Sequence, residues 1–384
     1  MTTTTPTTTR WHGKLGSQET WEPPERVTQF DVAARDYCED RIMAHEYADR
    51  PEVLEQKVKR LADLVRRSGN LVAFTGAGIS TAAGIDDYAS KAKGQSVTSA
   101  GKAIVKDWKD AQPTKAHRIL AAMYEAEHLK HWIQQNHDSL PQKAGYPQHA
   151  LNEIHGSMHD PANPIVPYEG TLRDDLFDWL HEWQLRSDLV LALGTSLSGF
   201  NVDSIAEAAA HHSPAEGGLG LVIVNLQQTP YDGECSLRLF AKIDDVLERL
   251  ADELQIAERV RPMDHAFVPA VAEGALLEED VVRVPFDGVT GEPIPDAPER
   301  WTTWDLRVGR RVKLTGGTYA GDVGTVMEKR PDGAYRIRFE DSIHPTFKVK
   351  RRPFSLWLGP WWLQEASHGF GITPGGRVPL LNVP

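Results

Sequence analysis

The chain has 384 residues, a mean hydropathy of −0.42 and a formal net charge of −12. This length favours one large α/β domain together with a smaller module. No apolar run approaches the ~20 residues that a membrane helix needs, and the Thr-rich start lacks the apolar core of a secretory signal. The acidic balance argues against non-specific binding of nucleic acid by the chain as a whole.

The chain contains only two cysteines, Cys38 and Cys235, which are far apart in the sequence. This pattern excludes a disulfide framework and a thiolate zinc site. It is typical of ordinary thiols in a reducing compartment. We therefore expect a cytoplasmic or nuclear protein that is not secreted, does not bind membranes and holds no metal.

Composition divides the chain into successive segments. Residues 1–50 are expected to form an N-terminal tail and arm. Residues 51–257 alternate apolar runs with amphipathic helical patterns, which predicts a doubly wound, Rossmann-like α/β domain with a parallel sheet. An acidic, Pro-rich connector is expected over 258–303, a small all-β barrel over 304–352 and a Trp-rich C-terminal tail over 353–384.

Within the large domain, residues 53–68 are expected to form a helix because their apolar residues recur at helical spacing. A short apolar strand at 71–74 follows, and a glycine loop leads from it into a helix expected to start near Ile79. The remaining expected elements are helices at 115–128 and 244–257 and strands at 131–134, 189–193 and 219–224.

Small or amide-bearing residues follow the four expected strands. These clusters are Gly76-Ala77-Gly78, Gln135-Asn136-His137-Asp138, Gly194-Thr195-Ser196 and Asn225-Leu226-Gln227. In open α/β sheets, ligands bind beyond the carboxyl ends of the strands. The glycines would let the backbone and a helix N-terminus approach a pyrophosphate, and the amides of Asn225 and Gln227 suit ribose hydroxyls. One Gly-rich turn would be weak evidence, and Thr81 stands where the usual fingerprint has its third glycine. Together the clusters predict a dinucleotide site.

These clusters also resemble the motifs of the sirtuin family, in the family's order, over roughly residues 50–250. Residues 113–117 and 172–174 resemble the nuclear branch of that family. The matching stretches are 76–85, 135–140, Ala144-Gly145, Glu153-Ile154-His155-Gly156, 194–197 and 224–230.

The resemblance implies an NAD-dependent protein deacylase. Such enzymes cleave the nicotinamide–ribose bond of NAD with the acyl oxygen of a modified lysine as nucleophile, and the acyl group passes to ADP-ribose. By motif, His155 is the general base for a ribose hydroxyl, a role that an ordinary histidine pKa of about 6.5 suits. Asn136 and Asp138 would bind the nicotinamide amide. The implied cofactor-binding residues are Gly76, Ala77, Gly78, Ser80, Asp87, Tyr88, Gln135, Gly194, Thr195, Ser196, Asn225, Gln227 and Ile243.

The sequence departs from the family in three places. Asp86-Asp87-Tyr88-Ala89 stands where Pro-Asp-Phe-Arg is usual, so the donor fork of an arginine is missing. Pro141 replaces a usual histidine. No cysteine lies between His155 and Leu172, so we expect the family's zinc ribbon to be absent. These changes predict weaker positioning of NAD and an altered peptide groove.

Three functions therefore stay open. The first is a protein-lysine deacylase with an unusual groove that takes an acylated protein or peptide. The second is a mono-ADP-ribosyltransferase or NAD glycohydrolase. The third is a catalytically weak NAD-binding sensor or scaffold. The presence of His155 favours the first over the third, whereas Ala89 favours the third.

The segment at 304–352 alternates polar and apolar residues between turns and resembles a KOW-type small β-barrel. Residues 305–352 carry 12 Lys and Arg against 6 Asp and Glu, and 348–352 is a basic run. This balance permits contact with nucleic acid or chromatin; docking on the catalytic domain is the alternative. Trp357, Trp361 and Trp362 are expected to be packing anchors. We expect the module to recruit a partner and to take no part in the chemistry.

Overall fold

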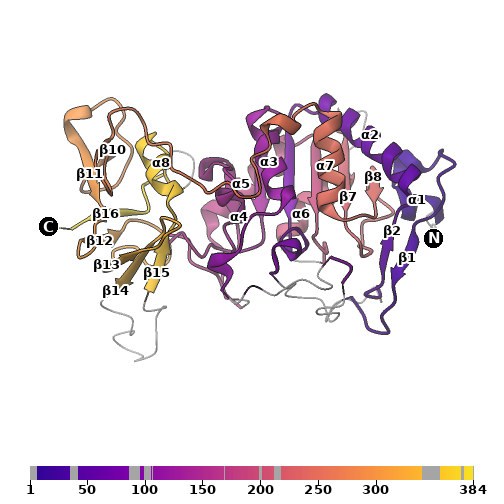
Figure 1. Cartoon of the computed structure of the whole chain (residues 1–384), viewed down its shortest axis with the longest axis horizontal. Helices are drawn as coiled ribbons and strands as arrows, with labels where there is room; N and C mark the ends of the chain where they lie inside the picture. The colour runs from indigo at the N-terminus through magenta and orange to yellow at the C-terminus, as the bar shows by residue number, and fades with distance from the viewer. Residues whose placement is uncertain are drawn as a thin grey trace. The chain divides into compact units, whose positions relative to one another are not determined.

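The computed structural model describes residues 7–34, 42–85, 96–98, 105, 107–167, 169–198, 201–211, 218–339, 355–372 and 376–383. The chain forms two compact units (Figure 1). Unit 1 comprises Met1–Asn136, Lys143–Tyr146 and Phe177–His265. Unit 2 comprises His137–Gln142, Pro147–Leu176 and Ala266–Pro384. Residues 147–176 thus cluster with the C-terminal residues.

A six-stranded sheet has the order β5-β4-β3-β6-β7-β8. Counted along the chain within this sheet, that order is 3-2-1-4-5-6, the Rossmann order, so the predicted doubly wound fold is confirmed. All residues of β3, β6 and β7 are buried, which explains their continuous apolar sequences. The strands are β3 (Leu71–Thr75), β4 (Leu129–Gln134), β5 (Leu151–Glu153), β6 (Leu189–Leu193), β7 (Gly220–Val224) and β8 (Leu237–Leu239).

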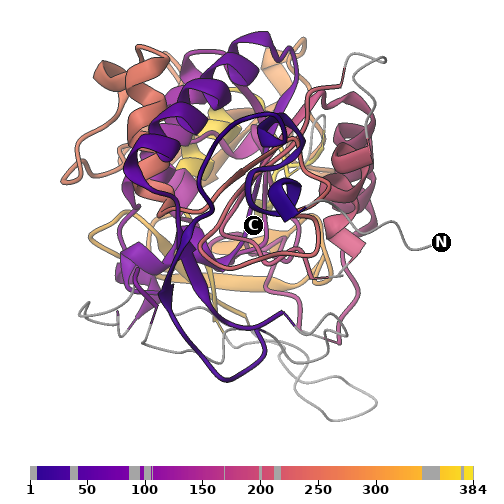
Figure 2. The same ribbon diagram turned by 90° about the vertical axis from the view of Figure 1, so that its right-hand side faces the viewer.

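Three helices of unit 1 match expected helices closely. These are α2 (Pro51–Arg67), α3 (Lys115–Glu125) and α7 (Ile243–Glu253). Helix α7 packs against both α2 and α3, and Figures 1 and 2 show α2 and α7 side by side. The helices α5 (Asp174–Arg186) and α6 (Ser204–His211) were not among the expected elements. No helix in the described ranges is long and apolar enough to cross a membrane.

The helix expected to start near Ile79 is wrong. The described residues there form two single 3₁₀ turns, η2 (Ala77–Ile79) and η3 (Thr81–Ala83). Each turn closes on the carbonyl three residues back, and Gly84, with φ +81°, ends the second turn. A 3₁₀ turn is short and closes within itself, so these residues do not form the α-helix N-terminus that was expected beside the pyrophosphate.

The N-terminal segment contributes regular elements to unit 1. Strands β1 (Glu25–Thr28) and β2 (Glu46–Ala48) pair antiparallel. Short elements elsewhere are α1 (Thr7–His12), η1 (Lys14–Gly16), η4 (Trp108–Asp110), α4 (Leu140–Lys143), η5 (Gln148–Ala150), η6 (Asn201–Asp203), η8 (Ala257–Arg259) and η9 (Pro298–Arg300).

The C-terminal part of unit 2 contains two antiparallel sheets, of order β11-β10-β9 and β15-β14-β13-β12-β16, and helix α8 (Trp361–Ser367). Strands thus occur in the stretches expected as a connector and as a tail, while the KOW assignment stays a prediction. The strands are β9 (Leu276–Glu278), β10 (Val281–Asp287), β11 (Trp301–Asp305), β12 (Arg311–Leu314), β13 (Val323–Lys329), β14 (Tyr335–Phe339), β15 (Ser355–Leu358) and β16 (Leu380–Asn382).

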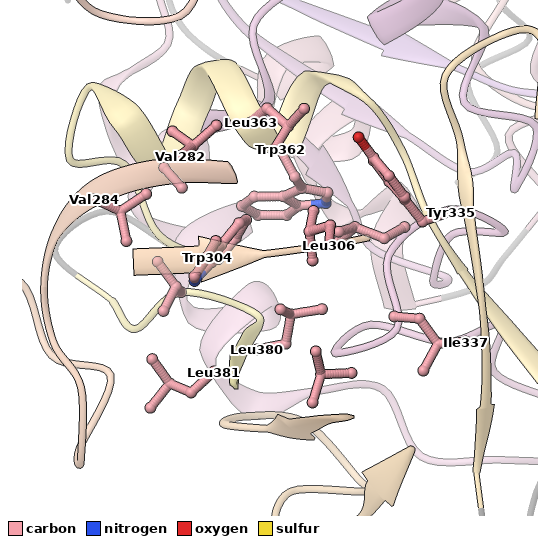
Figure 3. Close-up of a cluster of buried hydrophobic side chains, with 14 of the residues drawn as sticks. Val282, Val284, Trp304, Leu306, Tyr335, Ile337, Trp362, Leu363, Leu380 and Leu381 are labelled. Carbon is pink, nitrogen blue, oxygen red and sulfur yellow. The ribbon is translucent and has the colours of Figure 1, made fainter. Parts of the chain in front are cut away.

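These two sheets and α8 share one apolar core (Figure 3). Trp304 and Trp362 lie at its centre, each 0% exposed, beside Tyr335. The expectation that Trp361 and Trp362 are packing anchors is confirmed, because both are buried. Trp357 is half-buried, with the Arg330 guanidinium 5.6 Å from its ring.

Candidate active site

The glycines that follow β3 and β6 touch each other. Gly78 N donates to Gly194 O at 2.9 Å, and a Cβ built on Gly78 would lie 2.7 Å from Gly194 Cα. Gly194 itself has φ +59°, a conformation that favours glycine. The strand order reverses between β3 and β6, and this is where open α/β sheets bind ligands. The backbone here is therefore shaped for close approach by a ligand.

The side-chain amide of Asn136 is hydrogen-bonded to the loop that follows β3. Its Nδ2 donates to Gly76 O and to Ser80 Oγ, each at 3.1 Å. Both bonds use the amide nitrogen, so the carbonyl oxygen is the atom of this side chain that can accept from an incoming amide. The structure thus brings together three of the predicted cofactor-site residues.

Thr195 joins two more of the expected strand ends. Its hydroxyl accepts from Gln135 Nε2 at 3.0 Å, and its carbonyl accepts from Asn225 Nδ2 at 3.2 Å. By contrast, Gln227 Nε2 is directed to Ala44 O at 3.5 Å. The side chains that follow β4, β6 and β7 therefore meet, as the sequence predicts for a common sheet edge.

The other predicted cofactor-site residues fall into three groups. Ala77 and Ser196 lie in the two strand-end loops, and Ile243 is the first residue of α7. Asp87 and Tyr88 lie outside the described residues, as does the family departure at Ala89.

Arg238, on β8, is a residue that sequence reasoning missed. It is 0% exposed, and its guanidinium donates to Asn225 O at 2.9 Å and to Gln227 O at 2.6 Å. Asp232 Oδ1 accepts from its Nε at 2.7 Å, which balances the buried charge. The sequence did contain a signal for Arg238. This arginine stands between two leucines in a buried strand, and a buried arginine requires polar partners. Arg238 fixes the backbone of the loop after β7.

His155 follows β5 in unit 2 and is half-buried. Gly156, with φ +87°, turns the chain after it, and a Cβ there would lie 2.3 Å from Pro164 O. Gly156 O lies 3.0 Å from His137 Nδ1, and the rings of His137 and His155 are 6.4 Å apart. The turn therefore holds the predicted general base beside the segment that begins at His137.

Asp138 is 2% exposed, and its Oδ1 accepts from Leu140 N at 3.1 Å at the start of α4. The next residue, Ser139, has its Oγ 3.0 Å from Ser157 Oγ. These contacts link the Asp138 segment to the His155 segment within unit 2. Asn136, the proposed partner of Asp138, belongs to unit 1.

Two buried carboxyl groups lie near His155 in the sequence and were also missed. Burial raises the pKa of Glu153 to about 8. Burial likewise raises the pKa of Asp160 to about 6, against the opposing effect of Arg173. Gln148 Nε2 donates to Glu153 Oε2 at 3.4 Å. Burial therefore favours the protonated form of Glu153.

Because Glu153 is buried, we expect this residue to make the stability of the folded protein depend on pH. The folded-state pKa of about 8 exceeds the ordinary value of 4.5, so the stabilisation is full below pH 4.5 and is lost as pH rises through 8. Relative to Glu153→Gln, the wild-type free energy of unfolding should fall by up to about 1.4 kcal/mol per pH unit in that window. Urea unfolding at several pH values measures this slope. Glu279→Gln, at a side chain 87% exposed, is the control and should follow the wild type. Parallel curves for Glu153→Gln and the wild type would contradict the prediction.

No group of three or more His, Cys, Asp or Glu residues that could hold a metal ion occurs among the residues placed by the structure. The phosphate-loop and amide residues lie in unit 1, whereas Asp138 and His155 lie in unit 2.

Comparison with known proteins identifies the family. A model described as the Sir2 family matches residues 95–164. The NAD-dependent protein deacetylase sirtuin-7 of Bos taurus is 30% identical over 336 residues, which cover 72% of this chain and 82% of that protein. The protein of the same name from Homo sapiens is 32% identical with the same coverage of each chain. A solved structure described as Sir2-p53 peptide-NAD+ is 25% identical, covers 52% of this chain and 99% of its own, and has a TM-score of 0.44. Because the two sirtuin-7 alignments extend over most of both proteins, this chain belongs to the Sir2 family, the sirtuins.

Proposed function

We propose that this protein is an NAD-dependent protein-lysine deacylase. It cleaves the nicotinamide–ribose bond of NAD and transfers the acyl group of a modified lysine to ADP-ribose. The observation that carries the proposal is the glycine contact between the ends of β3 and β6, with the amides of Asn136, Gln135 and Asn225 bonded around it. The two sirtuin-7 relatives are named NAD-dependent protein deacetylases, which supports the same reaction.

The residues present fit NAD. A side chain at Gly78 would collide with the backbone of Gly194, so the loop keeps only backbone atoms where a pyrophosphate needs close approach. Gly76, Ser80 and Thr195 would surround the phosphates and ribose. When bound, NAD supplies the ribose carbon whose bond to nicotinamide breaks.

We assign the remaining roles to Asn136, Asp138 and His155. An amide and a carboxylate together can accept from and donate to the carboxamide of nicotinamide. His155 in its neutral form accepts the proton of a ribose hydroxyl, which allows the acyl group to be passed on. Gly156 sets the direction of the chain at that histidine, because no other residue fits its φ and its contact with Pro164.

The test is release of nicotinamide from NAD with an acetylated peptide, with the same peptide unacetylated, and with no peptide. We expect release that depends on the acetyl group and yields the deacetylated peptide in equal amount. Release without peptide would instead identify an NAD glycohydrolase, and ADP-ribose attached to protein would identify a transferase. Binding of NAD without release would identify a sensor or scaffold.

Contact with nucleic acid or chromatin through the C-terminal module stays a prediction from its charge. The basic run at 348–352 lies outside the described residues. The acyl-lysine reaction is the function that the described geometry supports.

A further inference from the structure

Glu365 of helix α8 holds the chain shortly before His155. Its side chain is 2% exposed. Its Oε1 accepts from Gln148 N at 3.2 Å, and its Oε2 accepts from His149 N at 3.3 Å and lies 2.8 Å from His149 Nδ1. Hydrogen bonds to a buried carboxylate are among the stronger ones in proteins. This carboxylate therefore fixes the turn η5, which leads directly into β5.

The side chain of Gln148 extends this connection towards the histidine. Its Oε1 accepts from the indole Nε1 of Trp361 at 3.1 Å, and its Nε2 donates to Glu153 Oε2 at 3.4 Å. Gln148 is 8% exposed and Glu153 is 1% exposed, so water does not compete for these bonds. Helix α8 is thus connected by hydrogen bonds to a residue two positions before His155.

A second attachment lies four positions after His155. Gly359 N donates to His159 O at 2.9 Å, and the ring of Trp361 packs edge-on against the His159 ring at 5.6 Å. His159 Nδ1 lies 3.2 Å from Ser139 Oγ, next to Asp138. The His155 turn is therefore held on both sides by residues 359–365.

Helix α8 is itself fixed from its other face. Trp362 and Ala366, both 0% exposed, pack into the apolar core with Val282 and Trp304 (Figure 3). Burial of an aromatic side chain of this size strongly favours the packed position of the helix. The helix is a rigid support, since its position is set by the β-sheets.

We infer that α8 is a positioning element for His155 and that Glu365 is its principal positioning residue. The inference rests on the proposed function, because it assigns Glu365 an effect on the deacylation step. The sequence alone predicted that the C-terminal module takes no part in the chemistry. In this inference the module instead affects the chemistry indirectly, through the position of His155.

The test uses the whole 384-residue chain and the variant Glu365→Gln, which keeps the side-chain size but places an amide donor against a backbone donor. We expect kcat for deacetylation to fall about 10- to 100-fold, the effect of misplacing a catalytic group by about 1 Å. The KM for NAD should change less than about twofold, because the glycine loop is in unit 1. Exchange of labelled nicotinamide into NAD should persist, since bond cleavage precedes proton removal by His155.

Glu279→Gln is the matched control, because its side chain is 87% exposed on the same unit, and it should match the wild type. Glu365→Asp, which keeps the carboxylate, should recover part of the lost kcat. If Glu365→Gln does not fold, Trp361→Phe decides, because it removes the indole donor to Gln148 and keeps an aromatic ring at that position.

An active wild type with an unaffected Glu365→Gln overturns the inference alone. So does a folded variant in which deacetylation and nicotinamide exchange fall together, because the defect then lies in cleavage of NAD and not in proton removal by His155. A wild type that releases no nicotinamide with acetylated peptide overturns the proposed function, and the inference with it.

Discussion

Replacing His155 by alanine is expected to lower deacetylation by about 10²- to 10⁴-fold, the usual contribution of a general base. The fold should survive, because the hydrogen bond in which His155 O accepts from Val166 N at 3.0 Å uses the backbone alone. The Gly156 turn also stays unchanged. Peptide-dependent formation of deacetylated product, measured at saturating NAD, gives the loss in kcat directly.

His211→Ala is the matched control for this measurement. His211 lies at the end of α6 with a side chain 62% exposed, and its Nδ1 lies 2.8 Å from Glu207 O in its own helix. This variant should turn over NAD at the wild-type rate. Unchanged turnover in His155→Ala would show that another group removes the proton.

Gly78→Ala is expected to raise the Kd for NAD at least tenfold, which corresponds to about 1.4 kcal/mol or more. The added Cβ would lie 2.7 Å from Gly194 Cα and 2.9 Å from Gly194 O, and both are backbone atoms. The loops after β3 and β6 must then separate, which weakens the Gly78 N to Gly194 O bond and moves the proposed phosphate cradle. Overpacking of this kind also costs about 1–3 kcal/mol of stability. Calorimetric titration with NAD measures the affinity.

Gly69→Ala provides the comparison within the same unit. Its Cβ would meet only Asp188 Oδ2, at 3.6 Å, which is an ordinary contact. We expect this variant to bind NAD as the wild type does. Equal affinity in both alanine variants would mean that the contact between Gly78 and Gly194 does not shape the nucleotide site.

The central sheet and its strand-end residues could be predicted because their signals are local. Buried parallel strands require continuous apolar runs, as in β3 and β6, and the residues after them must then share one edge of the sheet. Gly76, Asn136 and Thr195 were found in this way. The helix predicted to start near Ile79 was wrong, because two single 3₁₀ turns stand there and Gly84, at φ +81°, ends the second.

The hydrogen bonds by which α8 supports the His155 turn could not be predicted from local sequence pattern. Glu365 and Gln148 are 217 positions apart, and neither lies in a motif. A glutamate on a short amphipathic segment is usually solvent-exposed. Its burial follows from Trp361 and Trp362, which turn one face of α8 to the β-sheets and another to η5.

The distance in sequence between His155 and α8 has a consequence for synthesis on the ribosome. Chains are made from the N-terminus, and domains begin to fold as they emerge. The glycine loop and its strands are complete once residue 239 has emerged, whereas the bonds made by Glu365 cannot form until the last part of the chain is made. We therefore expect the strands around the glycine loop to be available for pairing during synthesis well before the hydrogen bonds that support the His155 turn can form.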